Sequence, residues 1–82
     1  MSSEMRSDTI TDIFRRVLET GDVGPQSDFF ASGGDSLLAT RILSALARTY
    51  GVELSYEELL LAPTPAALAE RVAAATATGV PQ

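Results

Sequence analysis

The sequence predicts an all-α fold, a small four-helix bundle with three longer helices, one short third helix and a long loop between the first two helices. Apolar residues recur at three- and four-residue intervals along three segments, which is the spacing of one helix face. Glycines, prolines and capping residues stand at the ends of these segments. A chain of 82 residues has room for one core, so we expect the helices to pack against one another.

The whole chain, residues 1–82, is predicted to form a single domain. An apolar fraction of 45% with 21% charged residues is typical of a folded protein. The stretch from Met1 to Ser7 is polar and patternless, and the composition drifts to alanine and threonine from Ala73 onward. We therefore expect a core within about residues 8–75 and flexible termini, the first of them a mobile lead-in.

The first helix is predicted from two contrasting faces. Its apolar face consists of Ile10, Ile13, Phe14, Val17 and Leu18. Its outer face consists of Thr11, Asp12, Arg15, Arg16 and Glu19. We expect Asp8 or Thr9 to cap the start of this helix and Gly21 to end it.

A long loop follows from Gly21 to Asp35, well above the usual loop length of about 4–6 residues. Its large apolar residues are Val23, Phe29 and Phe30, and we expect them to pin the loop to the core. Because aromatic residues dominate small cores, the simplest interpretation of the two phenylalanines is that they fill the core.

The second helix is predicted from Ser36 to Tyr50. At about 100° per residue, its buried face gathers Leu38, Ala39, Ile42, Leu43, Leu46 and Tyr50. The opposite arc carries Thr40, Arg41, Ser44, Ala47 and Arg48. Leu37 also falls on this exposed arc, where it is either tucked against the long loop or available to a partner.

The last two helices are predicted from their capping residues. Ser55 and Glu58 have the spacing of a capping box, which starts a short helix running to about Leu61. Gly51 ends the second helix before it. Thr64 and Pro65 start the last helix as a cap followed by proline at the first helical position. Its buried face contains Leu68, Val72 and Ala75.

Composition argues against several classes of function. Eleven acidic residues against six arginines give a net charge of −5, which disfavours nucleic acid as a partner. Without cysteine or histidine, neither the usual zinc ligands nor the usual general bases and thiolate nucleophiles are present, so no metal site and no enzymatic activity are predicted. No window approaches the roughly 20 apolar residues of a membrane span, and we expect a cytoplasmic monomer.

The most informative stretch is Asp28 to Leu38, which leads into the second helix. Gly33 and Gly34 relax the backbone just before Asp35 and Ser36. A helix start favours negative charge, so a phosphate linked to the Ser36 hydroxyl would be well placed. Taken alone, Asp and Ser at this position are better explained as helix caps.

The wider pattern resembles the carrier-protein family, specifically the peptidyl carrier, or thiolation, domains of nonribosomal peptide synthetases. The resemblance covers about residues 8–75. It is carried by these stretches: Asp28-Phe29-Phe30, Gly33-Gly34-Asp35-Ser36-Leu37-Leu38-Ala39, Arg41-Ile42-Leu43, Gly51-Val52-Glu53-Leu54 and Ala62-Pro63-Thr64-Pro65-Ala66-Ala67-Leu68-Ala69.

This resemblance implies a 4'-phosphopantetheine arm on Ser36, transferred from coenzyme A by a Mg²⁺-dependent transferase, with Asp35 and Gly34 beside it. Leu37, Thr40, Arg41 and Ser44 are the implied partner face. The implied partners are the transferase, an adenylation enzyme or domain, and condensation, thioesterase or tailoring enzymes. The arm would hold an amino acid or peptide as a thioester, and the chain itself would catalyse nothing.

Two features depart from the family pattern, and two alternatives stay open. Ser32 stands where the family often has leucine, and Pro25 stiffens the loop. One alternative is an acyl carrier for polyketide or fatty-acid intermediates; the absence of acidic residues in the second helix, with Arg41 and Arg48 present, favours the peptidyl branch. The other is a helical interaction module without a prosthetic group, in which Asp35 and Ser36 only cap the helix.

Overall fold

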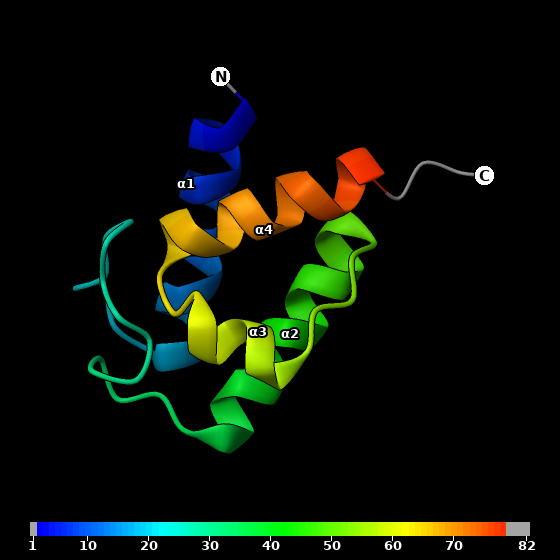
Figure 1. Cartoon of the computed structure of the whole chain (residues 1–82). Helices are drawn as coiled ribbons and strands as arrows, with labels where there is room; N and C mark the ends of the chain where they lie inside the picture. The colour runs from blue at the N-terminus through cyan, green and yellow to red at the C-terminus, as the bar shows by residue number, and fades with distance from the viewer. Residues whose placement is uncertain (1, 79–82) are drawn as a thin grey trace.

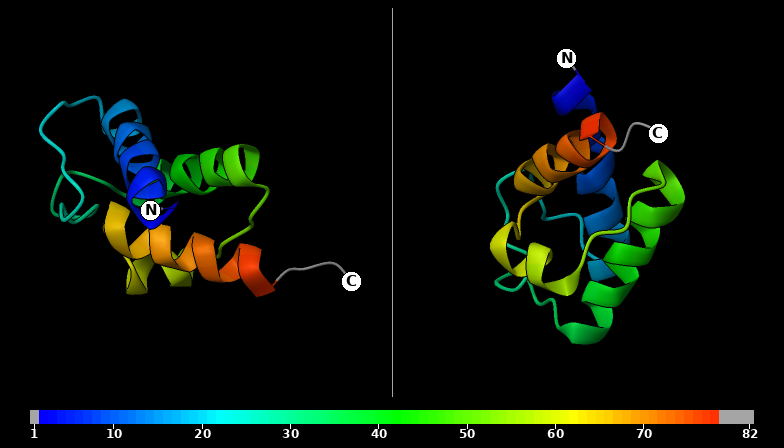
Figure 2. Two further views of the ribbon diagram at one scale, coloured as in Figure 1. Left: turned by 90° about the horizontal axis from the view of Figure 1, so that it is seen from above. Right: turned by 45° about the vertical axis from the view of Figure 1, so that its right-hand side comes forward.

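The computed structural model describes residues 2–78, with side chains from residue 7 to residue 76. Every regular element in this part of the chain is an α-helix. Four helices follow one another: α1 (Ser2–Leu18), α2 (Ser36–Tyr50), α3 (Tyr56–Leu61) and α4 (Pro65–Thr78). The helix α1 contacts both α2 and α4, and α3 contacts α2. Figures 1 and 2 show the long loop at the end of the bundle away from the C-terminal ends of α2 and α4. The predicted four-helix fold is confirmed.

The core contains residues from all four helices and from the segments that connect α1 to α2 and α2 to α3. It contains most of the residues predicted for it from helical spacing. Its buried apolar members are Ile10, Ile13, Phe14, Val23, Phe29, Ala39, Ile42, Leu46, Val52, Leu59, Ala62, Leu68, Ala69 and Val72. The predicted core residues Val17, Leu18, Leu38, Leu43, Tyr50 and Ala75 are half-buried against it.

One residue predicted on the outer face, Thr11, is instead buried. Its hydroxyl donates to the Ser7 carbonyl oxygen at 2.7 Å, which satisfies the polar group inside the helix.

The start of α1 differs from the prediction. The helix begins at Ser2, so the predicted mobile lead-in is helical, and Asp8 and Thr9 lie inside the helix rather than capping it. The stretch ahead of Asp8 contains glutamate, methionine and arginine, which are good helix formers. It can extend a helix that is already anchored by Ile10 without contributing an apolar face of its own.

The end of α1 also differs from the prediction. The helix ends at Leu18, and the left-handed residue after it is Glu19, with φ of 56°, rather than Gly21. The Thr20 amide donates to the Arg15 carbonyl oxygen at 3.1 Å, which closes the last turn. A side chain in the left-handed region is strained, so Glu19 is the residue where this helix end costs stability.

Replacing Glu19 with glycine is expected to raise the free energy of unfolding by about 0.5–1 kcal/mol, because relief of the left-handed Cβ penalty of about 1–2 kcal/mol outweighs the entropy of about 0.4–1 kcal/mol that glycine adds to the unfolded chain. Urea unfolding followed by circular dichroism measures this change. The matched control is Glu19→Ala, which removes the same charge but keeps the Cβ and should bring no gain. Equal stabilisation by both variants would show that charge, and not backbone conformation, limits this turn.

The remaining helix ends follow the predicted capping residues. Gly51 is left-handed, with φ of 69°, and donates to the Ala47 carbonyl oxygen at 2.9 Å at the end of α2. Ser55 and Glu58 form the capping box of α3, with the Glu58 amide 3.1 Å from the Ser55 hydroxyl. The Thr64 hydroxyl accepts from the Ala67 amide at 3.1 Å at the start of α4.

The helix α4 continues past Ala73 to Thr78, and the predicted fraying of this end stays a prediction. The predicted linker stub from Gly79 to Gln82 lies outside the described residues. Within residues 2–78, every helix is too short or too polar to cross a bilayer.

The long loop is fixed to the rest of the bundle by its apolar anchors and by its backbone. Val23 and Phe29 are buried as predicted, and Phe30 is half-buried. The Phe29 amide donates to the Pro63 carbonyl oxygen at 2.7 Å, and the Ala66 amide donates to the Pro25 carbonyl oxygen at 3.0 Å. The loop is thus joined to the junction of α3 and α4, which holds the start of α2 in place.

Candidate functional site

The residues before α2 form a compact turn wrapped around one aromatic ring. The Asp28 carboxylate accepts from the amides of Phe30 and Ala31 at 2.8 and 3.0 Å. The Ser32 amide donates to the Asp28 carbonyl oxygen at 3.0 Å, and the Gly34 amide donates to the Phe29 carbonyl oxygen at 3.0 Å. Ser32 therefore takes part in the turn through its backbone, which leaves the side chain at this position free to vary.

The two glycines in this turn are required for different reasons. Gly33 has φ of +102°, a conformation that L-residues rarely adopt. Gly34 lies against the ring of Phe29, and a Cβ at this position would come within 3.0 Å of three ring carbons. One glycine therefore permits the turn, and the other allows the chain to pass over a buried ring just before Ser36.

Asp35 is the N-cap of α2. Its backbone is extended and its carboxylate accepts from the Leu38 amide at 2.9 Å, while its carbonyl oxygen accepts from the Ala39 amide at 2.8 Å. The capping interpretation is therefore confirmed for Asp35. It does not explain Ser36, which is the first residue of the helix and follows the cap.

Ser36 presents a free hydroxyl at the surface. The residue is exposed, and no residue with a described side chain forms a hydrogen bond with its hydroxyl. Its carbonyl oxygen accepts from the Thr40 hydroxyl at 3.1 Å. The amides of Ser36 and Leu37 belong to the first turn of α2 and have no partner within residues 2–78, and that turn carries no acidic residue. A nucleophilic serine would need an activating base, and the chain has no histidine.

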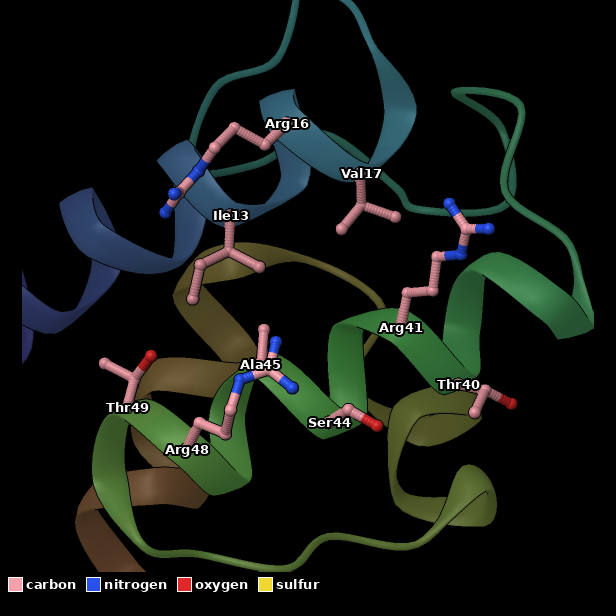
Figure 3. A pocket seen from close by; sticks show the side chains of 9 residues that line it. All are labelled: Ile13, Arg16, Val17, Thr40, Arg41, Ser44, Ala45, Arg48 and Thr49. Atoms are coloured by element: carbon pink, nitrogen blue, oxygen red, sulfur yellow. The ribbon is translucent and has the colours of Figure 1, made fainter.

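The predicted partner face divides into two parts. Leu37 is 63% exposed, so it is not tucked against the long loop. Thr40, Arg41 and Ser44 are exposed and line a groove of about 600 Å³ between α1 and α2, which Leu37 does not line (Figure 3). The exposure predicted for Thr40, Arg41 and Ser44 is confirmed, and Leu37 takes the exposed one of its two predicted positions. The role of all four toward a partner stays a prediction.

Sequence reasoning missed two features of the surface: the exposed leucines of α3 and the groove between α1 and α2. Leu60 and Leu61 of α3 are 49% and 73% exposed. The sequence did indicate that leucines of α3 are exposed, because three consecutive residues of a helix spread over about 200° and cannot all face the core. The three are Leu59, Leu60 and Leu61. Nothing in the sequence indicated the groove, because its lining residues come from α1 and α2, and the sequence did not specify how these two helices pack.

Together, the fold and the turn define a small helical domain that presents one exposed serine at the start of its second helix. A family model described as "Phosphopantetheine attachment site" matches residues 8–72 of this chain. Among curated proteins, a dimodular nonribosomal peptide synthase of Bacillus subtilis (strain 168) is 43% identical over 67 residues, which is 82% of this chain and 3% of that protein. The chain thus spans a small part of that relative.

Solved structures agree with this match. One is a peptidyl carrier protein in complex with the phosphopantetheine transferase Sfp and coenzyme A, with a TM-score of 0.81 and 35% identity over 84% of this chain and 90% of that chain. Another is an active-site mutant of a peptidyl carrier protein, with a TM-score of 0.84 and 32% identity over 95% of this chain and 84% of that chain. The chain belongs to the phosphopantetheine-binding carrier family, among its peptidyl carrier proteins, and its cofactor is 4'-phosphopantetheine derived from coenzyme A.

Proposed function

We propose that Ser36 is the residue that carries the phosphopantetheine arm, and that this chain shuttles aminoacyl or peptidyl groups between the enzymes of a nonribosomal peptide pathway. The observation that carries the proposal is the exposed, unbonded Ser36 hydroxyl on the first residue of α2. The turn from Asp28 to Gly34 leads into α2, so the Ser36 hydroxyl lies at the exposed start of this helix, where another enzyme can reach it.

The residues around Ser36 fit a phosphodiester. The amides of Ser36 and Leu37 are the unpaired donors of the first turn of α2, and a negative charge at a helix N-terminus gains about 0.3–1 kcal/mol. Asp35 is the one carboxylate next to the serine, and one of its oxygens is engaged by the Leu38 amide. We propose that its other oxygen helps to hold the divalent cation during transfer, and that Gly34 contributes by letting the backbone pass over the Phe29 ring just before Ser36.

The bound arm supplies a thiol that holds an amino acid or peptide as a thioester. The chain's own contribution is to present Ser36 at an exposed helix end, with no catalysis of its own. Tethering raises the effective concentration of the cargo at each enzyme in turn. We propose as partners a phosphopantetheinyl transferase, an adenylation enzyme or domain, and condensation, thioesterase or tailoring enzymes, with the carrier acting as a monomer.

Intact mass spectrometry tests this function. Incubation of the protein with coenzyme A, Mg²⁺ and a transferase of broad specificity is expected to add the mass of one phosphopantetheine group. Subsequent incubation with adenylation enzymes and amino acids, or with malonyl and acyl donors, distinguishes a peptidyl carrier from an acyl carrier. A protein that gains no mass would support the interaction module without a prosthetic group.

Replacing Leu37 with alanine is expected to slow the transferase reaction several-fold while changing the free energy of unfolding by less than about 0.5 kcal/mol. The side chain is 63% exposed and follows Ser36 directly, so an enzyme acting on Ser36 has to cover it. The rate of mass gain and a thermal melt measure the two effects. Leu61→Ala is the matched control, being 73% exposed but on α3. A large loss of thermal stability in Leu37→Ala would instead show that Leu37 belongs to the core.

A further inference from the structure

The groove between α1 and α2 has a composition that the carrier function does not by itself explain. Its apolar floor consists of Ile13, Val17 and Ala45, and Thr40, Ser44 and Thr49 also line it. Three guanidinium groups surround them, from Arg16, Arg41 and Arg48. Figure 3 shows Ile13 and Val17 pointing from α1 toward α2, with Arg41 and Arg48 projecting from α2. We call this surface the arginine groove.

The charge of the arginine groove is opposite to that of the chain as a whole. None of the nine residues that line it is acidic, although the net charge of the protein is −5. Among the side chains of residues 7–76, the two other arginines are paired: Arg15 lies 3.0 Å from Asp12, and Arg71 lies 3.7 Å from Glu58. The three groove arginines form no ion pair with any described side chain. Positive charge is thus concentrated here without an internal counter-ion.

We propose that the arginine groove binds an acidic, partly apolar segment of a partner protein. Guanidinium groups match carboxylates in geometry and charge, and the apolar floor between them can take an aliphatic side chain from the same segment. A segment with carboxylates flanking an aliphatic residue therefore complements both the rim and the floor. The inference rests on the proposed carrier function, because the partner is an enzyme that acts on the tethered cargo.

The position of the groove agrees with this role. Its first α2 residue, Thr40, lies one helical turn beyond Ser36, and neither Ser36 nor Leu37 lines it. At 1.5 Å per residue, Ser44 lies about 12 Å along the helix from Ser36. A partner segment held in the groove would therefore leave the attachment serine uncovered, so that the arm can enter the partner's active site while the carrier is held.

A small phosphate-bearing ligand explains the groove less well. Arg41 and Arg48 are seven residues apart on α2, which separates their backbones by about 10 Å along the helix. They are spread along the groove rather than gathered around one point, which suits an extended chain of carboxylates. The side chains of Ile13 and Val17 in the apolar floor provide neither a positive charge nor a hydrogen-bond donor to a phosphate.

The proposal is tested by titrating the ¹⁵N-labelled chain of residues 1–82 with a synthetic peptide of glutamate and leucine at helical spacing, with glutamine replacing glutamate in the control peptide. The acidic peptide is expected to shift the amide signals of Thr40, Ser44 and Ala45, and its affinity should fall at 1 M salt, where the Debye length shrinks to about 3 Å. The triple variant Arg16→Gln, Arg41→Gln, Arg48→Gln should bind about 3- to 125-fold more weakly, given roughly 1.4- to 5-fold per exposed ion pair. The control variant Arg15→Gln, Arg71→Gln should stay within about twofold of the wild type, because these arginines lie outside the groove.

Several outcomes would overturn the proposal. These are the absence of groove shifts at millimolar acidic peptide, equal binding of the glutamine peptide, and unchanged binding by the triple variant. Groove shifts with inorganic pyrophosphate but not with the peptide would identify a small-anion site. Sedimentation showing a dimer that the triple variant abolishes would identify a second copy of this chain as the occupant. Because mass gain on Ser36 is measured separately, a failure of the carrier function is distinguishable from a failure of this proposal.

Discussion

Replacing Ser36 with alanine is expected to abolish phosphopantetheine attachment and to leave the four-helix fold intact. The substitution removes one exposed hydroxyl that bonds to no described residue, and it places a good helix former at the first position of α2. The change in the free energy of unfolding should stay within about 0.5 kcal/mol. Intact mass after incubation with coenzyme A, Mg²⁺ and the transferase measures attachment, and a thermal melt measures the fold.

The control for this loss is Ser7→Ala, which removes another serine hydroxyl, from α1, outside the candidate site, the predicted partner face and the arginine groove. That variant is expected to gain the phosphopantetheine mass as the wild type does. If Ser36→Ala gained the mass equally, the arm would be attached elsewhere and the assignment of Ser36 would be wrong. If wild type and both variants all failed to gain it, the result would support the interaction module without a prosthetic group.

Helix ends were predictable where a side chain or a glycine determines them. Asp35, Gly51 and Ser55 each cap as their residue type predicts. The end of α1 was not predictable in this way, because a glutamate occupies the left-handed position and the nearby Gly21 does not. The start of α1 was missed for a related reason: Ser2 to Ser7 extends a helix anchored further along the chain and needs no apolar pattern of its own.

The candidate site was predictable in its identity but not in its surroundings. The stretch around Ser36 points to a carrier because the residue types occur in a specific order. The reason for Gly34 is a contact with the Phe29 ring, five residues earlier, which only the folded loop reveals. The arginine groove joins Arg16 of α1 to Arg41 and Arg48 of α2, so it depends on how the two helices pack.

Replacing Phe29 with alanine is expected to remove much of the stability of the domain. The ring is fully buried, makes edge-to-face contacts with Phe14 and Phe30 at centroid distances of 5.5 and 5.0 Å, and supports Gly34. A buried Phe→Ala change costs about 3–5 kcal/mol, and a domain of 82 residues has about 4–12 kcal/mol in total. Urea unfolding measures the loss, and Phe30→Ala, at a half-buried position, should cost clearly less.

A double-mutant cycle separates the specific contact between the Phe29 ring and Gly34 from the general loss of packing when Phe29 is replaced. Gly34→Ala is expected to destabilise the wild type, because its Cβ would overlap the Phe29 ring. In the Phe29→Leu background, which keeps an apolar residue and a folded domain, the same change should cost at least about 1 kcal/mol less. Additive losses would show that the ring and the glycine are independent. Coupled losses would mean that the core residue Phe29 determines which residue can precede Asp35 and Ser36, and so links the packing of the loop to the presentation of the serine.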